Sequence, residues 1–332
     1  MRAASWICGF AFNVLGAAPS GAFDPWTETA RYEIEYRADL ASLGARAGDL
    51  VRVWLPMPAA NPYQTVLSSE VEAPWPHRET RDRYGNRFVH LEGKGADRAG
   101  SAAVLRFAVE RRPARGVSQA DVREGTPLDP QLHLGAQRKV PLDGVIREIA
   151  EQQSRGLDTD AEKVRAFYDY VYRTMRYSKE GEGWGRGDAV WACASKYGNC
   201  TDFHSLLMGM ARSQGIPARF VIGFPIPPDK TEATVTGYHC WAEVYEAERG
   251  WLPLDASEAW KAKRKDDYFG TLPSDRVEFT VGRDLVLEPP QQGEPVNYFI
   301  YPYAEVDGVP VASVPWTLQF RRVEPAVARS ER

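Results

Sequence analysis

Three short segments between residues 198 and 255 carry side chains that together could perform thiol chemistry. They read Gly-Asn-Cys-Thr-Asp-Phe-His from residue 198, Tyr-His-Cys-Trp-Ala-Glu-Val from residue 238 and Gly-Trp-Leu-Pro-Leu-Asp from residue 250. Cys200 supplies a nucleophile, His239 a base and Asp255 a carboxylate that can orient the base. These residue types predict a thiol nucleophile activated by a histidine–aspartate pair.

Cys200 is predicted to lie in the first turn of a helix. Asn199 is a common N-cap residue, and Gly215 marks the end of the helix. Between them, apolar side chains recur at helical spacing, at Phe203, Leu206, Leu207 and Met210. Cys200 lies at the edge of this stripe, where a side chain can face a cleft, and the helix N-terminus should lower its pKa.

His239 and Asp255 are predicted to lie on the two strands of one hairpin. The strand that starts at His239 alternates, which places Cys240 on the opposite face, and the return strand ends at Asp255. If the hairpin is centred near Ala247, His239 lies directly opposite Asp255 and the two side chains share a face. On this register Cys240 points away from the site.

Another interpretation of the same residues is a zinc site. Its ligands would be Cys200, His204, His239 and Cys240. The alternation separates His239 from Cys240, however, and there is no second closely spaced pair, so we expect no metal and no cofactor. His204 follows Cys200 by one helical turn and is interpreted as an ordinary histidine at the core boundary that could also line the cleft.

The rest of the chain predicts an α+β protein with a β-rich domain before the catalytic core. Residues 27–115 show short alternating runs separated by turns, which favours a small antiparallel sandwich; Tyr32, Ile34 and Tyr36 share one face. Residues 116–140 form a polar connector. The core is assigned to residues 141–265.

Within the core, helices are predicted over residues 143–156, 159–177 and 188–197. The four glycines between residues 181 and 187 predict a mobile loop, and residues 225–236 a second loop. Residues 266–324 are predicted to complete or flank the core with strands at 276–281, 284–288, 298–301 and 316–320.

Bulk composition excludes some classes of function. The net charge of −4 argues against a nucleic-acid partner, which needs a basic surface. No run is apolar for long enough to predict a membrane span. Residues 1–22 resemble a signal peptide, which predicts export to the periplasm or outside the cell; the alternative is an apolar arm on a cytoplasmic protein.

Without residues 1–22 the chain keeps an odd number of cysteines: Cys193, Cys200 and Cys240. In an oxidising compartment an odd number predicts at least one free thiol. A bridge between Cys193 and Cys240 would leave Cys200 free, but the sequence alone does not establish it.

Four segments together resemble the transglutaminase-like superfamily, in particular its exported bacterial branch with an N-terminal β-domain. They are residues 198–202, residues 215–219, the strand led by His239, and residues 250–255, within a similarity that spans residues 157–259. The resemblance implies a papain-like core with Cys200 as nucleophile, His239 as general base and acid, and Asp255 as orienter. The family's oxyanion site commonly adds an upstream tryptophan, for which Trp184 is favoured over Trp191.

The resemblance implies acyl transfer from amide bonds of peptides or proteins. Hydrolysis by a peptidase or amidase is favoured over crosslinking, because no feature of the sequence positions an amine against competing water. The alternative is a non-catalytic module that binds peptides or cell-wall stems in the same cleft. The presence of all three residues, Cys200, His239 and Asp255, favours the enzyme.

Overall fold

The computed structural model describes residues 22–95, 101–115, 129–247 and 249–324. The predicted signal peptide, apart from its last residue, and about half of the predicted connector lie outside the described residues. The domain boundaries in the connector therefore stay a prediction. In the described part of the chain, no helix has the length and apolar character that crossing a membrane requires.

The N-terminal part supplies six strands: β1 (Ala30–Asp39), β2 (Leu50–Pro56), β3 (Gln64–Glu72), β4 (His77–Arg81), β5 (Arg87–Lys94) and β6 (Ala102–Arg111). Later segments add β10 (Glu232–Val235), β14 (Tyr303–Val306), β15 (Val309–Pro310) and β16 (Trp316–Val323). They form two sheets with the orders β10-β16-β1-β6-β3 and β15-β14-β2-β5-β4. Along β1 the alternation buries Tyr32, Ile34 and Tyr36 in a shared core, as the sequence predicts.

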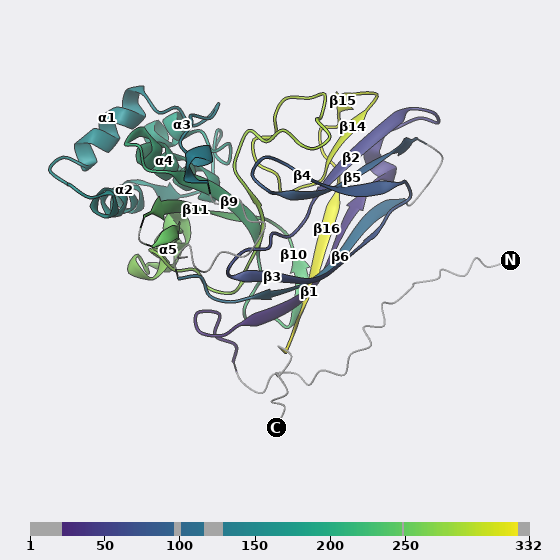
Figure 1. The fold of residues 1–332 in the computed structure, drawn as a ribbon, viewed down its shortest axis with the longest axis horizontal. Helices are drawn as coiled ribbons and strands as arrows, with labels where there is room; N and C mark the ends of the chain where they lie inside the picture. The colour runs from purple at the N-terminus through teal and green to yellow at the C-terminus, as the bar shows by residue number, and fades with distance from the viewer. Residues whose placement is uncertain (1–21, 96–100, 116–128, 248, 325–332) are drawn as a thin grey trace.

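The C-terminal strands are divided between the two halves of the molecule. β14, β15 and β16 join the N-terminal sheets, and yellow β16 lies beside purple β1 in Figure 1. β10 pairs with β16, although the sequence predicts a loop there. Residues 284–288 and 298–301 are loops rather than the predicted strands, and an isolated bridge between Leu285 and Val296 is the pairing found there. Their apolar side chains, Leu285, Leu287 and Phe299, are buried in a separate cluster with Trp54 and Phe88.

The catalytic sheet has the order β12-β11-β9-β13 and is antiparallel. Its strands are β9 (Ala218–Pro225), β11 (His239–Glu246), β12 (Gly250–Leu254) and β13 (Arg276–Val281). Tyr36 of β1 contacts Phe224 and Phe279 of this sheet, with ring centroids 5.8 and 6.1 Å apart. These aromatic contacts join the catalytic sheet to the β-sandwich.

In the described part of the chain, five helices lie on the side of the catalytic sheet away from the β-sandwich (Figure 1): α1 (Gly144–Gln153), α2 (Asp160–Thr174), α3 (Ala189–Ser195), α4 (Cys200–Ser213) and α5 (Ala256–Ala262). A short parallel pair, β7 (Arg176–Tyr177) and β8 (Tyr197–Gly198), leads into α4, and 3-10 turns occupy Ala41–Leu43, Pro130–His133 and Asp266–Tyr268. α4 packs on β9 and β11 and touches all four other helices, so every one of its residues is buried. The predicted α+β class is confirmed.

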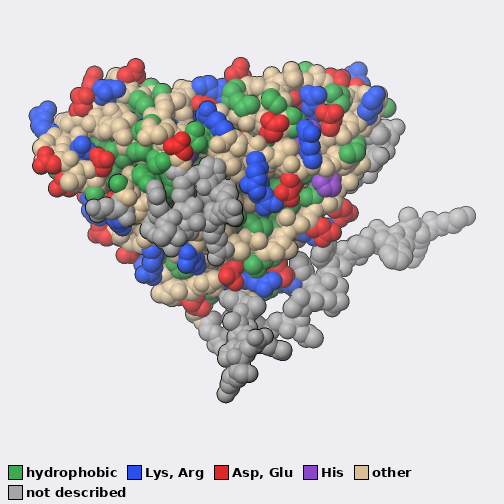
Figure 2. Space-filling view, in the orientation of Figure 1, with side chains coloured by type: hydrophobic (Ala, Val, Ile, Leu, Met, Phe, Trp, Pro, Cys, Tyr) green, Lys and Arg blue, Asp and Glu red, His purple; other side chains and the backbone are tan. Residues whose placement is uncertain are grey.

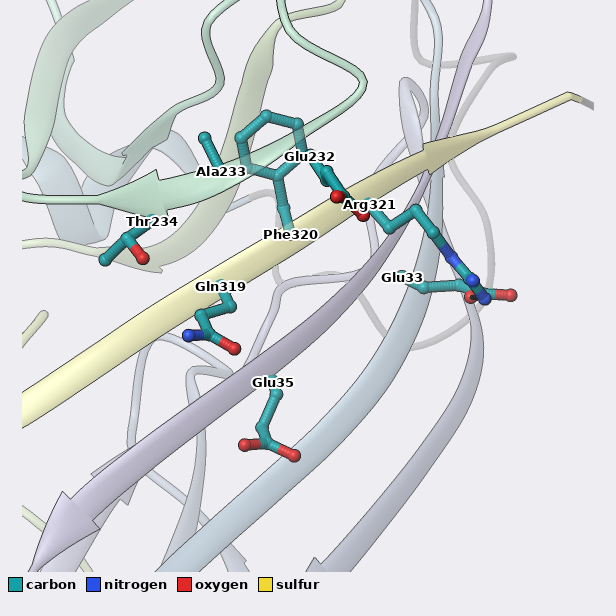
Figure 3. Close-up of a pocket in the computed structure, with 8 residues that line it drawn as sticks. All are labelled: Glu33, Glu35, Glu232, Ala233, Thr234, Gln319, Phe320 and Arg321. Atoms are coloured by element: carbon teal, nitrogen blue, oxygen red, sulfur yellow. Dashed lines mark hydrogen bonds and ion pairs between the residues drawn. The ribbon is translucent and has the colours of Figure 1, made fainter. Parts of the chain in front are cut away.

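The outer face of the first sheet carries a shallow hollow of about 350 Å³. Figure 3 shows that Glu33, Glu35 and Arg321 line it from β1 and β16. Arg321 donates to Glu33 at 2.6 Å. On the face in Figure 2, basic and acidic side chains are intermixed. The hollow shares no residue with the thiol site described next.

Candidate active site

Cys200 is the first residue of α4, as predicted. The Asn199 side chain accepts a hydrogen bond from Thr201 N at 2.9 Å, and the Asp202 carboxylate accepts one from Asn199 N at 2.9 Å. This reciprocal capping box fixes the start of the helix. Cys200 is only 3% exposed.

His239 opens β11 and Asp255 directly follows β12. His239 Nε2 lies 2.5 Å from Asp255 Oδ2, so the structure brings the predicted base and carboxylate together. The predicted register is wrong, because Ala242 pairs with Leu254 and the ladder places Asp255 level with Trp241. The predicted register is shifted by two residues, and side chains two residues apart on a strand share a face. His239 and Asp255 therefore still touch, as diagonal rather than directly opposite neighbours.

The second oxygen of Asp255 is held by the helix that follows. Asp255 is the N-cap of α5, and its Oδ1 accepts from Glu258 N at 2.9 Å and from Ser257 Oγ at 3.0 Å. Because the cap occupies Oδ1, Oδ2 is presented to His239 in a fixed orientation. The chemistry of the site and the capping of α5 therefore depend on one carboxylate.

The charges of these groups favour a thiolate and an imidazolium. Burial alone would raise the pKa of the Cys200 thiol, but hydrogen bonds from Cys240 and His239 lower it well below its ordinary value. Burial alone would lower the pKa of His239, but Asp255 and the Cys200 sulfur raise it to about 9. Burial opposes ionisation of Asp255 too, yet His239 holds its pKa well below the usual range.

The structure corrects the prediction that Cys240 points away from the site. Cys240 Sγ lies 3.7 Å from His204 Nδ1 and 3.9 Å from Thr201 Oγ1, and it hydrogen bonds with Cys200. The alternation along β11 is regular, but α4 packs on the face that carries Cys240. Cys200 therefore contacts Cys240 on that face, while His239 reaches the thiol from the end of the strand.

Cys193, Cys200 and Cys240 are all free, so the bridge considered between Cys193 and Cys240 is not formed. Cys193 lies on α3, where its sulfur is 3.8 Å from Lys196 Nζ. Burial holds the pKa of Cys240 well above its ordinary value, which keeps its proton on sulfur.

His204 belongs to the site, although the sequence favoured an ordinary boundary residue. It is fully buried, and its Nε2 lies 3.5 Å from Asp255 Oδ1. Burial lowers the pKa of His204, so the ring is neutral. The signal in the sequence is its spacing: a residue four positions after Cys200 lies on the same side of the helix.

The loop at residues 181–187 is held in place, in contrast to the predicted mobility. Asp202 accepts hydrogen bonds from Gly185 N at 2.6 Å and Gly187 N at 3.0 Å. Buried Arg283 donates to Gly187 O at 2.7 Å and to Ser205 Oγ at 2.6 Å. All four glycines of the loop have positive φ, which explains the glycine-rich sequence. Arg283 was not predicted from the sequence.

Two tryptophans were predicted as candidates for the oxyanion site. The Trp184 indole N–H donates to Gly181 O at 3.1 Å. Trp191 contacts Tyr197 edge-on, with centroids 5.2 Å apart. The assignment of either residue to the oxyanion site stays a prediction.

Tyrosines that the sequence did not single out border the thiol. The Tyr238 hydroxyl lies 2.8 Å from Thr201 Oγ1 and 3.4 Å from the Tyr298 hydroxyl. Tyr298 also donates to Gly185 O at 3.3 Å. The rings of Tyr238 and Tyr298 are both partly exposed. The C-terminal loop therefore contributes Tyr298 to the surface beside Cys200.

Within the described ranges, the potential ligand atoms of His239, Asp255 and Glu258 lie within 4.8 Å of one another. Glu258 is already paired with Lys261 at 2.7 Å and Arg276 at 3.6 Å. A metal ion would have to displace these ion pairs, so we assign none. The zinc site considered from the sequence would use a different set of ligands: Cys200, His204, His239 and Cys240.

Residues 147–256 match the family model described as the Transglutaminase-like superfamily. The chain is similar to an uncharacterized protein of Haemophilus influenzae, with 25% identity over 330 residues, 86% of this chain and 89% of that protein. It is also similar to YebA of Bacillus subtilis, another uncharacterized protein, with 28% identity over 129 residues, 35% of this chain and 18% of YebA.

A similar fold occurs in the crystal structure of a candidate cysteine protease from Cytophaga hutchinsonii. The TM-score is 0.59 at 15% sequence identity, and the superposition covers 91% of this chain and 93% of the other. At this identity the similarity shows the fold alone.

Proposed function

Since residues 147–256 match the model of the transglutaminase-like superfamily, we propose that this chain is a cysteine-dependent enzyme acting on amide bonds of peptides or proteins. Cys200 is the nucleophile, His239 the general base and acid, and Asp255 the orienter. The observation that carries the proposal is the buried His239–Asp255 pair, 2.5 Å apart, beside a thiol at a helix N-terminus.

The geometry supports a two-step reaction. His239 Nε2 faces Asp255, which leaves Nδ1 for the thiol. Cys200 Sγ bonds to the amide carbonyl carbon, the C–N bond breaks, and the His239 imidazolium gives its proton to the leaving amine. Water then loses a proton to His239 and attacks the thioester. The C–S bond breaks, which releases the acid and restores the thiolate and the imidazolium.

The backbone N–H of Cys200 is the proposed main donor to the oxyanion. The capping bonds at Asn199 engage the N–H groups of Thr201 and Asp202. The N–H at the first position of α4 points along the positive end of the helix, where a developing oxyanion is stabilised. Trp184 and Trp191 stay candidates for a second donor.

Hydrolysis is proposed over crosslinking, because water needs no binding site and an acceptor amine does. The N-terminal residues 1–22 support export, with a periplasmic or extracellular peptide or protein as substrate. Profiling with a peptide library, with and without an added primary amine, separates the two reactions. Release of the acid in both conditions supports a hydrolase; a dominant amine adduct supports crosslinking.

The second class of function is a binding module without catalysis, and thiol reactivity tests it. We expect iodoacetamide to alkylate Cys200 stoichiometrically at pH 6, because the pKa of its thiol is held well below the ordinary value by hydrogen bonds from Cys240 and His239. His239→Ala should slow the labelling, and Cys200→Ala should abolish it. Cys193→Ala is the matched control and should label like the wild type. A wild-type thiol that reacts only near its ordinary pKa contradicts the enzyme.

The pH dependence of kcat/KM should show an alkaline limb near pH 9. Asp255 and the Cys200 sulfur raise the pKa of His239 to about 9, so the imidazolium that protonates the leaving amine is lost above that pH. Initial rates on a peptide identified by profiling measure it. A limb near the ordinary histidine pKa would contradict the assignment of His239.

A further inference from the structure

Four aromatic side chains form a row of ring contacts that begins beside the nucleophile. The Tyr238 hydroxyl lies 2.8 Å from Thr201 Oγ1 and accepts a hydrogen bond from Asn199 Nδ2 at 3.2 Å. Thr201 and Asn199 are the two chain neighbours of Cys200, and Tyr238 itself precedes His239. This set, which we call the aromatic row, consists of Tyr298, Tyr238, Tyr301 and Trp316.

Each ring of the aromatic row touches the next. The ring centroid of Tyr238 lies 5.5 Å from that of Tyr298 and 5.8 Å from that of Tyr301. Tyr301 stacks on Trp316 of β16, with centroids 4.8 Å apart. Trp316 in turn contacts Tyr36 of β1, with centroids 5.9 Å apart. The row therefore extends from the neighbours of the thiol to the β-sandwich, which fixes its far end.

The tyrosines of the row present ring carbon to solvent. All three are partly exposed, yet the Tyr298 hydroxyl donates to Gly185 O at 3.3 Å and the Tyr238 hydroxyl is bonded beside Cys200. Burial raises the pKa of Tyr238 and of Tyr298, and it raises the pKa of Tyr301 to about 12. Because these hydroxyls are withdrawn from water, the exposed part of each residue is its ring.

The segments that carry the aromatic row have no charged side chains. Residues 233–238, 295–304 and 311–320 contain no Asp, Glu, Lys or Arg, in a chain of which 26% of the residues are charged. The glycine loop at residues 181–187, by contrast, carries the exposed side chains Glu182 and Arg186. An uncharged row of rings favours an apolar ligand, because a charged group loses hydration when it packs against ring carbon.

We propose that the aromatic row determines specificity, by binding an aromatic or large aliphatic side chain of the peptide substrate next to the amide that Cys200 attacks. This inference rests on the function proposed above and names its substrate class. An apolar side chain that packs on the rings is removed from water, and aromatic pairs attract beyond the area that they bury. Through Trp316, the β-sandwich takes part in substrate recognition.

The plain alternative is that the four rings only pack the junction between the catalytic sheet and the β-sandwich. In that case the loss of one ring lowers stability but leaves the choice between two reagents unchanged. The ratio of the rates with two reagents that differ by one apolar group separates the two interpretations, because any effect on the reactivity of the thiol cancels in the ratio.

The test compares iodoacetamide with N-phenethyl-iodoacetamide on the full chain, with peptide mapping at Cys200. In both reactions Cys200 Sγ bonds to the methylene carbon and iodide leaves, and free cysteine measures the intrinsic difference between the reagents. After that correction we expect the phenethyl reagent to alkylate Cys200 on the order of tenfold faster, the effect of one apolar group on an aromatic surface. Iodoacetyl-glycine, which carries a carboxylate in place of the ring, should show no gain.

Tyr301→Ala should remove most of the gain with the phenethyl reagent and leave the rate with iodoacetamide unchanged. Tyr301→Phe keeps the ring and should keep the gain. Tyr301→Gln, which fills part of the space with a polar side chain, replaces the alanine variant if that variant does not fold. Trp75→Ala is the matched control: Trp75 is partly exposed and packs on Gly93 of the β-sandwich, so its loss should leave the gain unchanged.

The outcomes separate this inference from the proposed function. A wild-type Cys200 that titrates like an ordinary thiol overturns the proposed function and this inference with it. A reactive Cys200 without a gain for the phenethyl reagent, or a gain that survives in Tyr301→Ala, overturns the role of the aromatic row alone. Equal slowing with both reagents in Tyr301→Ala assigns the ring to packing and overturns it too. In the peptide profiling, a preference for charged residues beside the cleaved amide would contradict it.

Discussion

Replacing Asp255 by asparagine is expected to lower kcat/KM on the order of 10⁴-fold, the loss that the same change causes in a serine protease triad. The amide carries no charge, so the Asp255 contribution that offsets burial and raises the pKa of His239 is lost, and the contribution of the Cys200 sulfur remains. The imidazolium then forms only at a lower pH than in the wild type, so less of the thiolate is paired with an imidazolium. Initial rates across pH 5 to 10 would show the loss of rate and a shift of the alkaline limb to lower pH.

Glu258→Gln is the matched control for this change. Its carboxylate also approaches His239 Nε2, at 3.9 Å, but it is partly exposed and paired with Lys261. A partly solvated charge at that distance contributes little, so the rate should fall only a few-fold. Equal losses in the two variants would show that general negative charge, rather than the oriented carboxylate of Asp255, supports the reaction.

Local sequence patterns predict the structure correctly where a short segment alone determines it. Asn199 and the apolar spacing after it place the start of α4 at Cys200. The alternation from His239 gives the correct faces of β11. The predicted register of the hairpin is wrong by two residues. The turn between Glu246 and Gly250 sets the register, and the alternation along the strands does not predict the length of that turn.

The prediction failed where packing of distant segments decides the outcome. Tertiary packing, rather than any local pattern, decides which face of the catalytic sheet α4 covers. Because α4 covers the face that carries Cys240, Cys240 lies beside Cys200. Arg283 binds the loop at Gly187 from 96 residues away, so no local signal identifies it. His204 is intermediate: its spacing from Cys200 was visible in the sequence, but its contact with Asp255 depends on how α5 begins.

Asp202→Ala is expected to cost about 4 kcal/mol in the free energy of unfolding. The carboxylate accepts three backbone N–H groups, from Asn199, Gly185 and Gly187, and a buried donor left without a partner costs about 1–3 kcal/mol. Because burial raises the pKa of Asp202, the fold gains from its acceptor oxygens rather than from its charge. Asp202→Asn, which keeps one acceptor oxygen, should therefore fall between the wild type and Asp202→Ala in urea unfolding.

Asp188→Ala separates the effect of burial from that of capping. Asp188 also caps a helix, accepting from Val190 N at 3.1 Å and Trp191 N at 3.0 Å, but at a partly exposed position where water can replace it. Its loss should cost about 1 kcal/mol, the ordinary value of a cap. Asp202→Ala should in addition slow alkylation of Cys200, because the released loop at Gly185 and Gly187 no longer holds the start of α4. Equal destabilisation by the two variants, with unchanged alkylation of Cys200, would show that Asp202 acts only as a helix cap and does not hold the loop in place.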